Sequence, residues 1–183
     1  MKKFPISIYR WVDNDYTPEA WGELSLNDND LHVKLTCIEK DPLARFTNFP
    51  DAAVHKDSCL EFFFTLNGLF PTYINFEANA IGGYYCSYHT TRQDKTFITP
   101  FTRDGFPKAT VSNDRWTVEA TFDVSEILKC FGADELTSIA VNFYKCGDET
   151  EFPHFGMWNE VKVAEPSFHE PAFFVNVPLE ELK

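Results

Sequence analysis

Residues 31–38 read LHVKLTCI, and apolar and polar side chains alternate along them from Leu31 to Cys37. Successive side chains of a β-strand point to opposite faces, so this period of two gathers the apolar residues on one face. Residues 27–30 (NDND) come just before, and Asn and Asp favour turns because their side chains hydrogen-bond the local backbone. The stretch therefore predicts a strand of an antiparallel sheet with one packed face and one solvated face.

The same signals recur along the chain. Further strands are predicted at residues 59–66, 73–81, 84–88, 116–122, 139–144 and 173–177. The dipeptide Asn67-Gly68 follows the first of these and is a strong hairpin signal. One short helix is predicted at residues 124–130, with Asp123 as its N-cap and Gly132 just after its end.

These elements predict an all-β fold. We expect an antiparallel two-sheet β-sandwich, immunoglobulin-like or jelly-roll-like, with one short helix. The hydrophobic fraction of 44% and the aromatic fraction of 16% suit a chain with a β-rich core. No internal repeat or low-complexity segment divides the sequence, so residues 1–183 are expected to form a single domain.

The charge of the chain limits its partners. Acidic residues outnumber basic ones by 28 to 16, for a formal net charge of −12. A surface of that sign repels phosphate backbones and anionic lipid, so neither nucleic acid nor membrane is expected as a partner. The negative charge does not exclude neutral ligands such as sugars, and it does not exclude calcium ions.

The cysteines and the first residues bear on location. The five cysteines are dispersed, with no C-x-x-C pair, which predicts free thiols rather than a disulfide framework. Residues 1–10 (MKKFPISIYR) lack the apolar segment of a signal peptide. We therefore expect a cytoplasmic protein.

Two neighbouring strands carry candidate binding residues. Glu61 lies between Leu60 and Phe62, where a carboxylate is costly to desolvate without a partner. Glu77 and Asn79 are two residues apart on the next strand and share a face. If the two strands pair, these groups form one polar patch with the acceptors and donors that sugar hydroxyls need.

Catalytic motifs are absent from the sequence. The five histidines are dispersed, and neither HExxH nor G-x-S-x-G nor a glycine-rich phosphate loop occurs. Two neighbouring carboxylates keep a glycoside hydrolase as an alternative, although the sequence cannot supply the separation that this mechanism needs. We expect no catalysis and no catalytic metal.

Two long segments without a strand pattern, residues 39–56 and 147–171, are expected to be functional loops. Trp158 lies in the second of them and is the best candidate for an exposed aromatic platform on which a sugar ring stacks. Trp116 begins a predicted strand and is expected to be packed.

Four segments occur in a fixed order along nearly the whole chain. They are residues 31–41 (LHVKLTCIEKD) followed by Pro42, residues 57–64 (DSCLEFFF), residues 73–80 (YINFEANA) with Gly82, and a closing set of residues 141–145 (VNFYK), Trp158 and residues 168–174 (FHEPAFF). Together they resemble carbohydrate-binding module family 9, whose fold is an antiparallel β-sandwich.

The resemblance implies a non-catalytic module that holds the end of a sugar chain, or a small saccharide, between aromatic side chains while polar groups bind its hydroxyls. By position, Trp158 corresponds to a stacking aromatic and Glu61 to a hydroxyl-binding carboxylate. The second aromatic position falls near Val54 and His55. The full predicted site is Trp158, Glu61, Glu77, Asn79, Asn142, His55 and Lys145. The expected ligand is a saccharide, and no cofactor is expected beyond a structural calcium ion.

Two other classes stay open. One is a scaffold or partner-binding sandwich that has lost sugar binding. The other is a haem-binding DOMON-like domain, a related sandwich in which Met and His can ligate iron; Met157 and His154, three residues apart, are its candidates.

Overall fold

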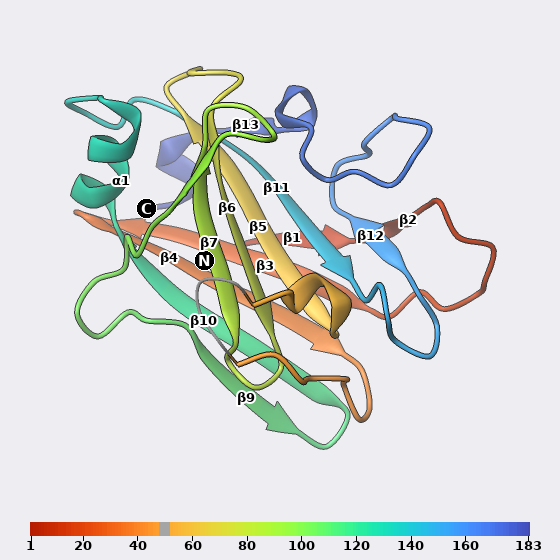
Figure 1. Cartoon of the computed structure of the whole chain (residues 1–183). Coiled ribbons are helices and arrows are strands. Elements are labelled where there is room, and N and C mark those ends of the chain that lie inside the picture. Colours follow the sequence, from red (N-terminus) through yellow and green to blue (C-terminus); the bar gives the residue numbers. More distant parts are fainter. Residues whose placement is uncertain (48–51) are drawn as a thin grey trace.

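The computed structural model describes residues 1–47 and 52–183, and its main elements are two antiparallel sheets (Figure 1). The first sheet has five strands. In spatial order they are β1 (Lys2–Ile6), β3 (Ala20–Asn27), β4 (Asp30–Ile38), β10 (Arg115–Asp123) and β9 (Lys108–Ser112).

The second sheet has eight strands. Its path runs β2 (Ile8–Tyr9), β12 (Phe155–Met157), β11 (Ile139–Cys146), β5 (Cys59–Leu66), β6 (Tyr73–Asn79), β7 (Tyr84–His89) and β8 (Lys95–Phe97), and β13 (Val175–Val177) pairs with β11. The predicted antiparallel β-sandwich is therefore confirmed. The strand order, which the sequence left open, places β5, β6 and β11 side by side.

The main core lies between the sheets. Alternate residues of each strand point inward, and the Phe62 ring stacks on Phe143 at a centroid distance of 5.0 Å and meets Phe122 edge-on. Trp116 is fully buried in this core, as predicted. Such aromatic contacts stabilise the sandwich through the large area that each ring removes from water.

The helix forms where the sequence predicted it. Helix α1 spans Val124–Phe131, and the Asp123 carboxylate accepts hydrogen bonds from the backbone N–H groups of Ser125 and Glu126. Gly132 ends the helix in the left-handed conformation, with φ of 62°. Short 3₁₀ helices cover Val54–Lys56, Pro171–Phe173 and Leu179–Glu181. No helix in the described ranges is long and apolar enough to cross a membrane.

Strands β1, β2, β3, β8, β9 and β12 were not predicted, and β3 shows one reason. Its residue Gly22 weakens a strand pattern, since glycine is disfavoured in strands. In the structure a Cβ on Gly22 would lie 2.1 Å from the Phe143 ring, so the glycine makes room for a core ring from the opposite sheet. The requirement comes from tertiary packing, which a local pattern does not contain.

The long loops cover the outer face of the eight-stranded sheet. Of the predicted loop 39–56, residues 48–51 lie outside the described residues; the predicted loop 147–171 includes strand β12. Beneath the loops is a second apolar cluster, made of Ala52, Val54, Cys59, Phe63, Tyr73, Ala140, Tyr144, Cys146, Met157, Val161, Phe168 and Phe174. The outer face of the eight-stranded sheet is therefore packed where the loops cover it. It is hollowed where they do not.

Candidate functional site

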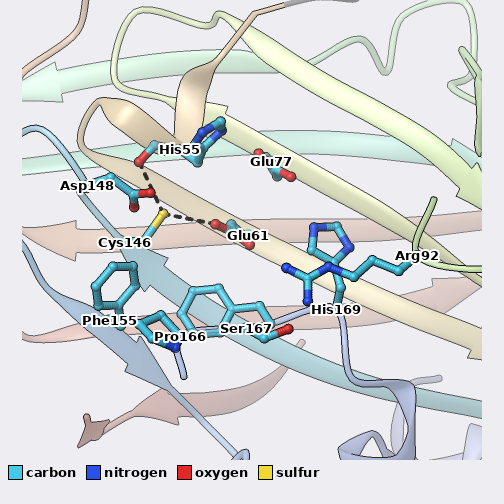
Figure 2. A pocket seen from close by; sticks show the side chains of 11 residues that line it. His55, Glu61, Glu77, Arg92, Cys146, Asp148, Phe155, Pro166, Ser167 and His169 are labelled. Atoms are coloured by element: carbon cyan, nitrogen blue, oxygen red, sulfur yellow. Dashed lines mark hydrogen bonds between the residues drawn. The ribbon is translucent and has the colours of Figure 1, made fainter. Parts of the chain in front are cut away.

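A pocket of about 250 Å³ opens on the outer face of the eight-stranded sheet (Figure 2). Strands β5, β6 and β11 form its floor, and the loops on either side form its walls. Its lining consists of His55, Glu61, Glu77, Arg92, Cys146, Asp148, Phe155, Pro166, Ser167, Phe168 and His169.

Two carboxylates lie next to each other on the pocket floor. Glu61 of β5 is the direct cross-strand partner of Glu77 of β6, so their Cβ atoms are about 4.5–5.5 Å apart. Their exposed fractions are 2% and 7%. The Cys146 thiol donates to Glu61 Oε1 at 2.9 Å, and the Asn75 amide donates to Glu77 Oε1 at 2.8 Å.

Burial dominates the acidity of both groups. It raises the pKa of Glu61 well above the usual range, and the neighbouring Cys146 and Glu77 raise it further. It raises the pKa of Glu77 to about 7, although the Asn75 hydrogen bond acts in the opposite direction. Neither carboxylate forms an ion pair with another described residue. The floor thus holds acceptors that gain from any donor or cation brought by a ligand.

One wall is a cluster of aromatic and imidazole rings. The Tyr73 ring stacks on His89 at 4.6 Å, and the Tyr73 hydroxyl shares a hydrogen bond of 2.8 Å with His169 Nδ1. Burial lowers the pKa of His89 to about 4 and that of His169 to about 3. Both rings are therefore neutral at pH 7 and can accept or donate hydrogen bonds without adding charge.

A second hollow of about 410 Å³ adjoins the pocket and shares His55, Glu77, Arg92 and His169 with it. The second hollow adds two aromatic side chains, Tyr85 and Phe97, whose rings meet edge-on at 5.3 Å. The Lys95 ammonium lies 5.2 Å from the centre of the Tyr85 ring. We call the two hollows together the outer groove. It has a carboxylate floor with aromatic rings at both ends.

Of the predicted site residues, the structure brings Glu61, Glu77 and His55 together in the outer groove. Asn79 shares the outward face but anchors a loop. Its amide donates to the Phe46 carbonyl at 2.7 Å and to the buried Asp57 carboxylate at 3.0 Å. This position fits a structural role for Asn79.

Asn142 is fully buried and also holds a loop. Its side-chain amide donates to the Asn159 carbonyl at 2.9 Å, and its oxygen accepts from the Asn159 backbone N–H at 3.0 Å. The residue thereby fastens the segment after β12 to β11. It does not line the outer groove.

Lys145 lies on the opposite face of the sheet from Glu61, a correction to the predicted site. Its cross-strand partner is Leu60, which faces the core, and Lys145 is fully buried. Its ammonium lies 3.4 Å from Glu39 Oε2 and 2.6 Å from His154 Nε2. Side chains alternate along β11, and Lys145 is three residues from Asn142. The two side chains therefore point to opposite faces of the sheet.

Trp158 also differs from its expected placement as an exposed platform. Its ring is half-buried and packs edge-on against Phe4 at 4.8 Å and against Phe143 at 6.4 Å. It lines neither hollow of the outer groove. Its contacts are those of a ring that seals the edge of the core.

The haem candidates are engaged by protein atoms. The Met157 sulfur accepts from the Val161 N–H at 3.2 Å, and His154 contacts Lys145 through Nε2 and the Phe152 carbonyl through Nδ1. Because both side chains point at protein atoms, neither is oriented to serve as an axial ligand of a haem iron.

Sequence reasoning missed several groove residues, among them Arg92, Cys146, Asp148 and His169. Cys146 could have been predicted from the sequence, because it is four residues from Asn142 on the same strand and so shares its face. Arg92 and Asp148 lie in turns after strands, where no local pattern marks an orientation. Loop residues of this kind become site residues only when the chain folds.

The fold and the groove define a β-sandwich with a ligand-sized polar pocket on the outer face of one sheet. The family model for carbohydrate-binding family 9 matches residues 1–179. The chain therefore belongs to carbohydrate-binding family 9.

Solved structures with the same fold are similar to this chain. A candidate carbohydrate-binding protein from Bacteroides uniformis superposes with a TM-score of 0.79 and 21% identity, over 96% of this chain and 84% of the other. A family 9 module from Caldicellulosiruptor kristjanssonii in complex with glucose gives a TM-score of 0.63 and 14% identity, over 97% of this chain and 83% of that one. A family 9 module from the same organism in complex with cellotriose gives a TM-score of 0.63 and 13% identity, over 97% of this chain and 81% of that one. No curated protein matches the chain significantly.

Proposed function

We propose that this protein binds a small saccharide, or the end of a sugar chain, in the outer groove and does not transform it. The observation that carries the proposal is the cross-strand pair Glu61 and Glu77, buried yet lining a groove with aromatic rings at both ends. Membership of carbohydrate-binding family 9 supports it. So does the family 9 module of the same fold that is seen with glucose and cellotriose.

Each part of the groove has a role in this proposal. Sugar hydroxyls donate to the carboxyl oxygens of Glu61 and Glu77, which have no counter-ion among the described residues. The exposed guanidinium of Arg92 offers donors to ring or hydroxyl oxygens. The apolar face of the sugar packs on Tyr85 or Phe97, of which Phe97 is 38% exposed.

The carboxylates are better suited to binding than to glycoside hydrolysis. A retaining glycosidase needs one ionised carboxylate as nucleophile and one protonated acid. Here burial raises the pKa of both Glu61 and Glu77, and no ion pair among the described residues holds either carboxylate ionised as a nucleophile. We expect no release of product from a panel of aryl glycosides above the buffer rate. Turnover that disappears in Glu61→Gln would establish a hydrolase instead.

Isothermal titration with glucose and cellotriose tests the binding. We expect dissociation constants of roughly millimolar to high micromolar, or about −4 to −6 kcal/mol. Glu61→Gln and Glu77→Gln should each weaken binding by about tenfold, because each replaces one carboxyl oxygen by an amide NH2 group that cannot accept a hydrogen bond from a sugar hydroxyl.

Glu119→Gln is the matched control, since Glu119 lies on a strand of the other sheet and pairs with Lys34. It should bind as the wild type does. If the wild type binds no glycan in an array of mono- and oligosaccharides, the saccharide proposal is wrong and a partner-binding sandwich takes its place.

Two expectations stay predictions: a cytoplasmic location and a structural calcium ion. Titration with glucose in the presence of calcium, and again in the presence of a chelator, measures whether binding depends on the calcium ion.

A further inference from the structure

We propose that Cys59, Glu61 and Cys146 form a binding site for a single thiophilic divalent cation, with Zn²⁺ as the best fit. Cys59 and Glu61 lie two residues apart on β5, and Cys146 lies on the neighbouring strand β11. Their ligand atoms, two sulfurs and a carboxylate oxygen, all lie within 4.8 Å of one another. This proposal does not depend on saccharide binding.

The register of the sheet brings the ligands together. Cys59 is the direct cross-strand partner of Cys146, and Glu61 is the partner of Tyr144. Residues 59, 61 and 146 therefore share the outer face. The Cys146 thiol already contacts Glu61 Oε1 at 2.9 Å. In a tetrahedral zinc site with bonds of about 2.0–2.3 Å, neighbouring ligand atoms are about 3.5–3.8 Å apart, so only small side-chain movements are needed.

The ligands are rigidly held, which favours a preformed site. Cys59 and Cys146 have exposed fractions of 0% and 1%, and Glu61 has 2%. Their backbones belong to the central strands of the larger sheet. Little conformational entropy is therefore lost when the cation binds.

The charges around the cluster also favour a cation. Glu61 and Glu77 lie side by side without a counter-ion among the described residues, and Asp148 lines the same pocket. Other ionisable groups that face the pocket are His55, Arg92 and His169, of which His169 is neutral at pH 7. A divalent ion on the floor would offset the negative charge of these neighbouring carboxylates.

The ligand set selects the metal. Two thiolates and one carboxylate suit Zn²⁺ and other thiophilic ions, whereas Ca²⁺ takes six to eight oxygens. When the ion binds, each thiol releases its proton to solvent and becomes a thiolate ligand. Glu61 and Cys146 line the open pocket, so we expect the fourth coordination position to face the groove. Water or a ligand oxygen would occupy it.

Cobalt titration of the full chain under reducing conditions tests this site. Co²⁺ occupies zinc sites and reports thiolate ligands by an ultraviolet charge-transfer band. We expect one equivalent of Co²⁺ to produce that band, Zn²⁺ to abolish it by displacement and Ca²⁺ to leave it unchanged. Cys59→Ser and Cys146→Ser should each weaken Co²⁺ binding by at least about 100-fold. Glu61→Gln should keep the band and weaken binding.

Cys130→Ser is the matched control, because Cys130 lies on α1, outside the cluster. It should titrate as the wild type does. Near-ultraviolet circular dichroism without metal checks that each variant is folded. A reduced wild type without the band, or a band that persists in the Cys59→Ser/Cys146→Ser double variant, would overturn the proposal. Because metal is titrated without sugar, and sugar with chelator present, each proposal can fail alone.

Discussion

The eight-stranded sheet carries buried ionisable side chains on both of its faces, and their surroundings differ between the two faces. On the inner face, Lys145 meets the buried Glu39, which also accepts hydrogen bonds from Trp116 Nε1 at 2.9 Å and Ser58 Oγ at 3.0 Å. On the outer face, Glu61 receives a weak thiol donor and lies beside another carboxylate.

The acidities follow this difference. Burial by itself raises the pKa of Glu39, but the Lys145 charge and the Trp116 and Ser58 hydrogen bonds outweigh it and lower that pKa below the usual range. On the outer face burial prevails, and the pKa values of Glu61 and Glu77 rise. The comparison teaches that a buried charge with a complete set of partners belongs to the fold, whereas one that lacks partners beside a pocket is free to serve a ligand.

The largest expected effect comes from breaking the inner cluster. Lys145→Met leaves the buried Glu39 carboxylate without its cation and should lower the free energy of unfolding by about 3–5 kcal/mol. Urea denaturation at pH 7 measures it. Lys34→Met is the control, because Lys34 and Glu119 form a more exposed pair, and it should cost under about 1 kcal/mol. Equal losses in both variants would refute the assigned role of the inner cluster.

On the outer face, the Glu77 carboxyl should destabilise the fold as pH rises. The pKa of Glu77 is raised in the folded state to about 7 from 4.5, so its contribution is fully present below pH 4.5 and is lost as pH rises through 7. Relative to the wild type, Glu77→Gln should gain up to about 3 kcal/mol between pH 4.5 and pH 8. Urea denaturation over this range measures the gain.

His154, which contacts Lys145 on the inner face, should show the opposite sign from Glu77. Burial lowers the pKa of His154 to about 4, with the Lys145 charge acting in the same direction. Its contribution is therefore lost as pH falls from 6.5 through 4. A difference between Glu77→Gln and wild type that does not vary with pH would contradict the contrast between the two faces.

The smallest of these effects separates a core ring from a groove ring. Trp158→Ala removes a half-buried ring from Phe4 and Phe143 and should cost about 2 kcal/mol of stability while cellotriose binding stays unchanged. Tyr85→Ala should show the reverse, with binding weakened by about 1 kcal/mol and little change in the melting temperature. Thermal unfolding and titration calorimetry on both variants decide it. Loss of binding in Trp158→Ala alone would restore the site expected from the sequence.

The sequence determined the fold class because alternation and turn chemistry are local. The period of two at residues 31–38, the turn residues after each strand and the Asp123 cap with Gly132 act within a few residues of chain. The sharing of a face by Glu61 and Glu77 needed only the pairing of two consecutive strands, which sequence neighbours commonly form.

Tertiary structure decided everything that depends on pairing between distant strands. The β5–β11 register brings Cys59 to Cys146 and Leu60 to Lys145, so the two thiols lie on the outer face of the sheet and the lysine on the inner face. The pairing of β12 with β11 precedes Trp158, whose half-buried ring packs on Phe4. Single-sequence patterns record the period of a strand but not its partner, and the partner determines which side chains meet.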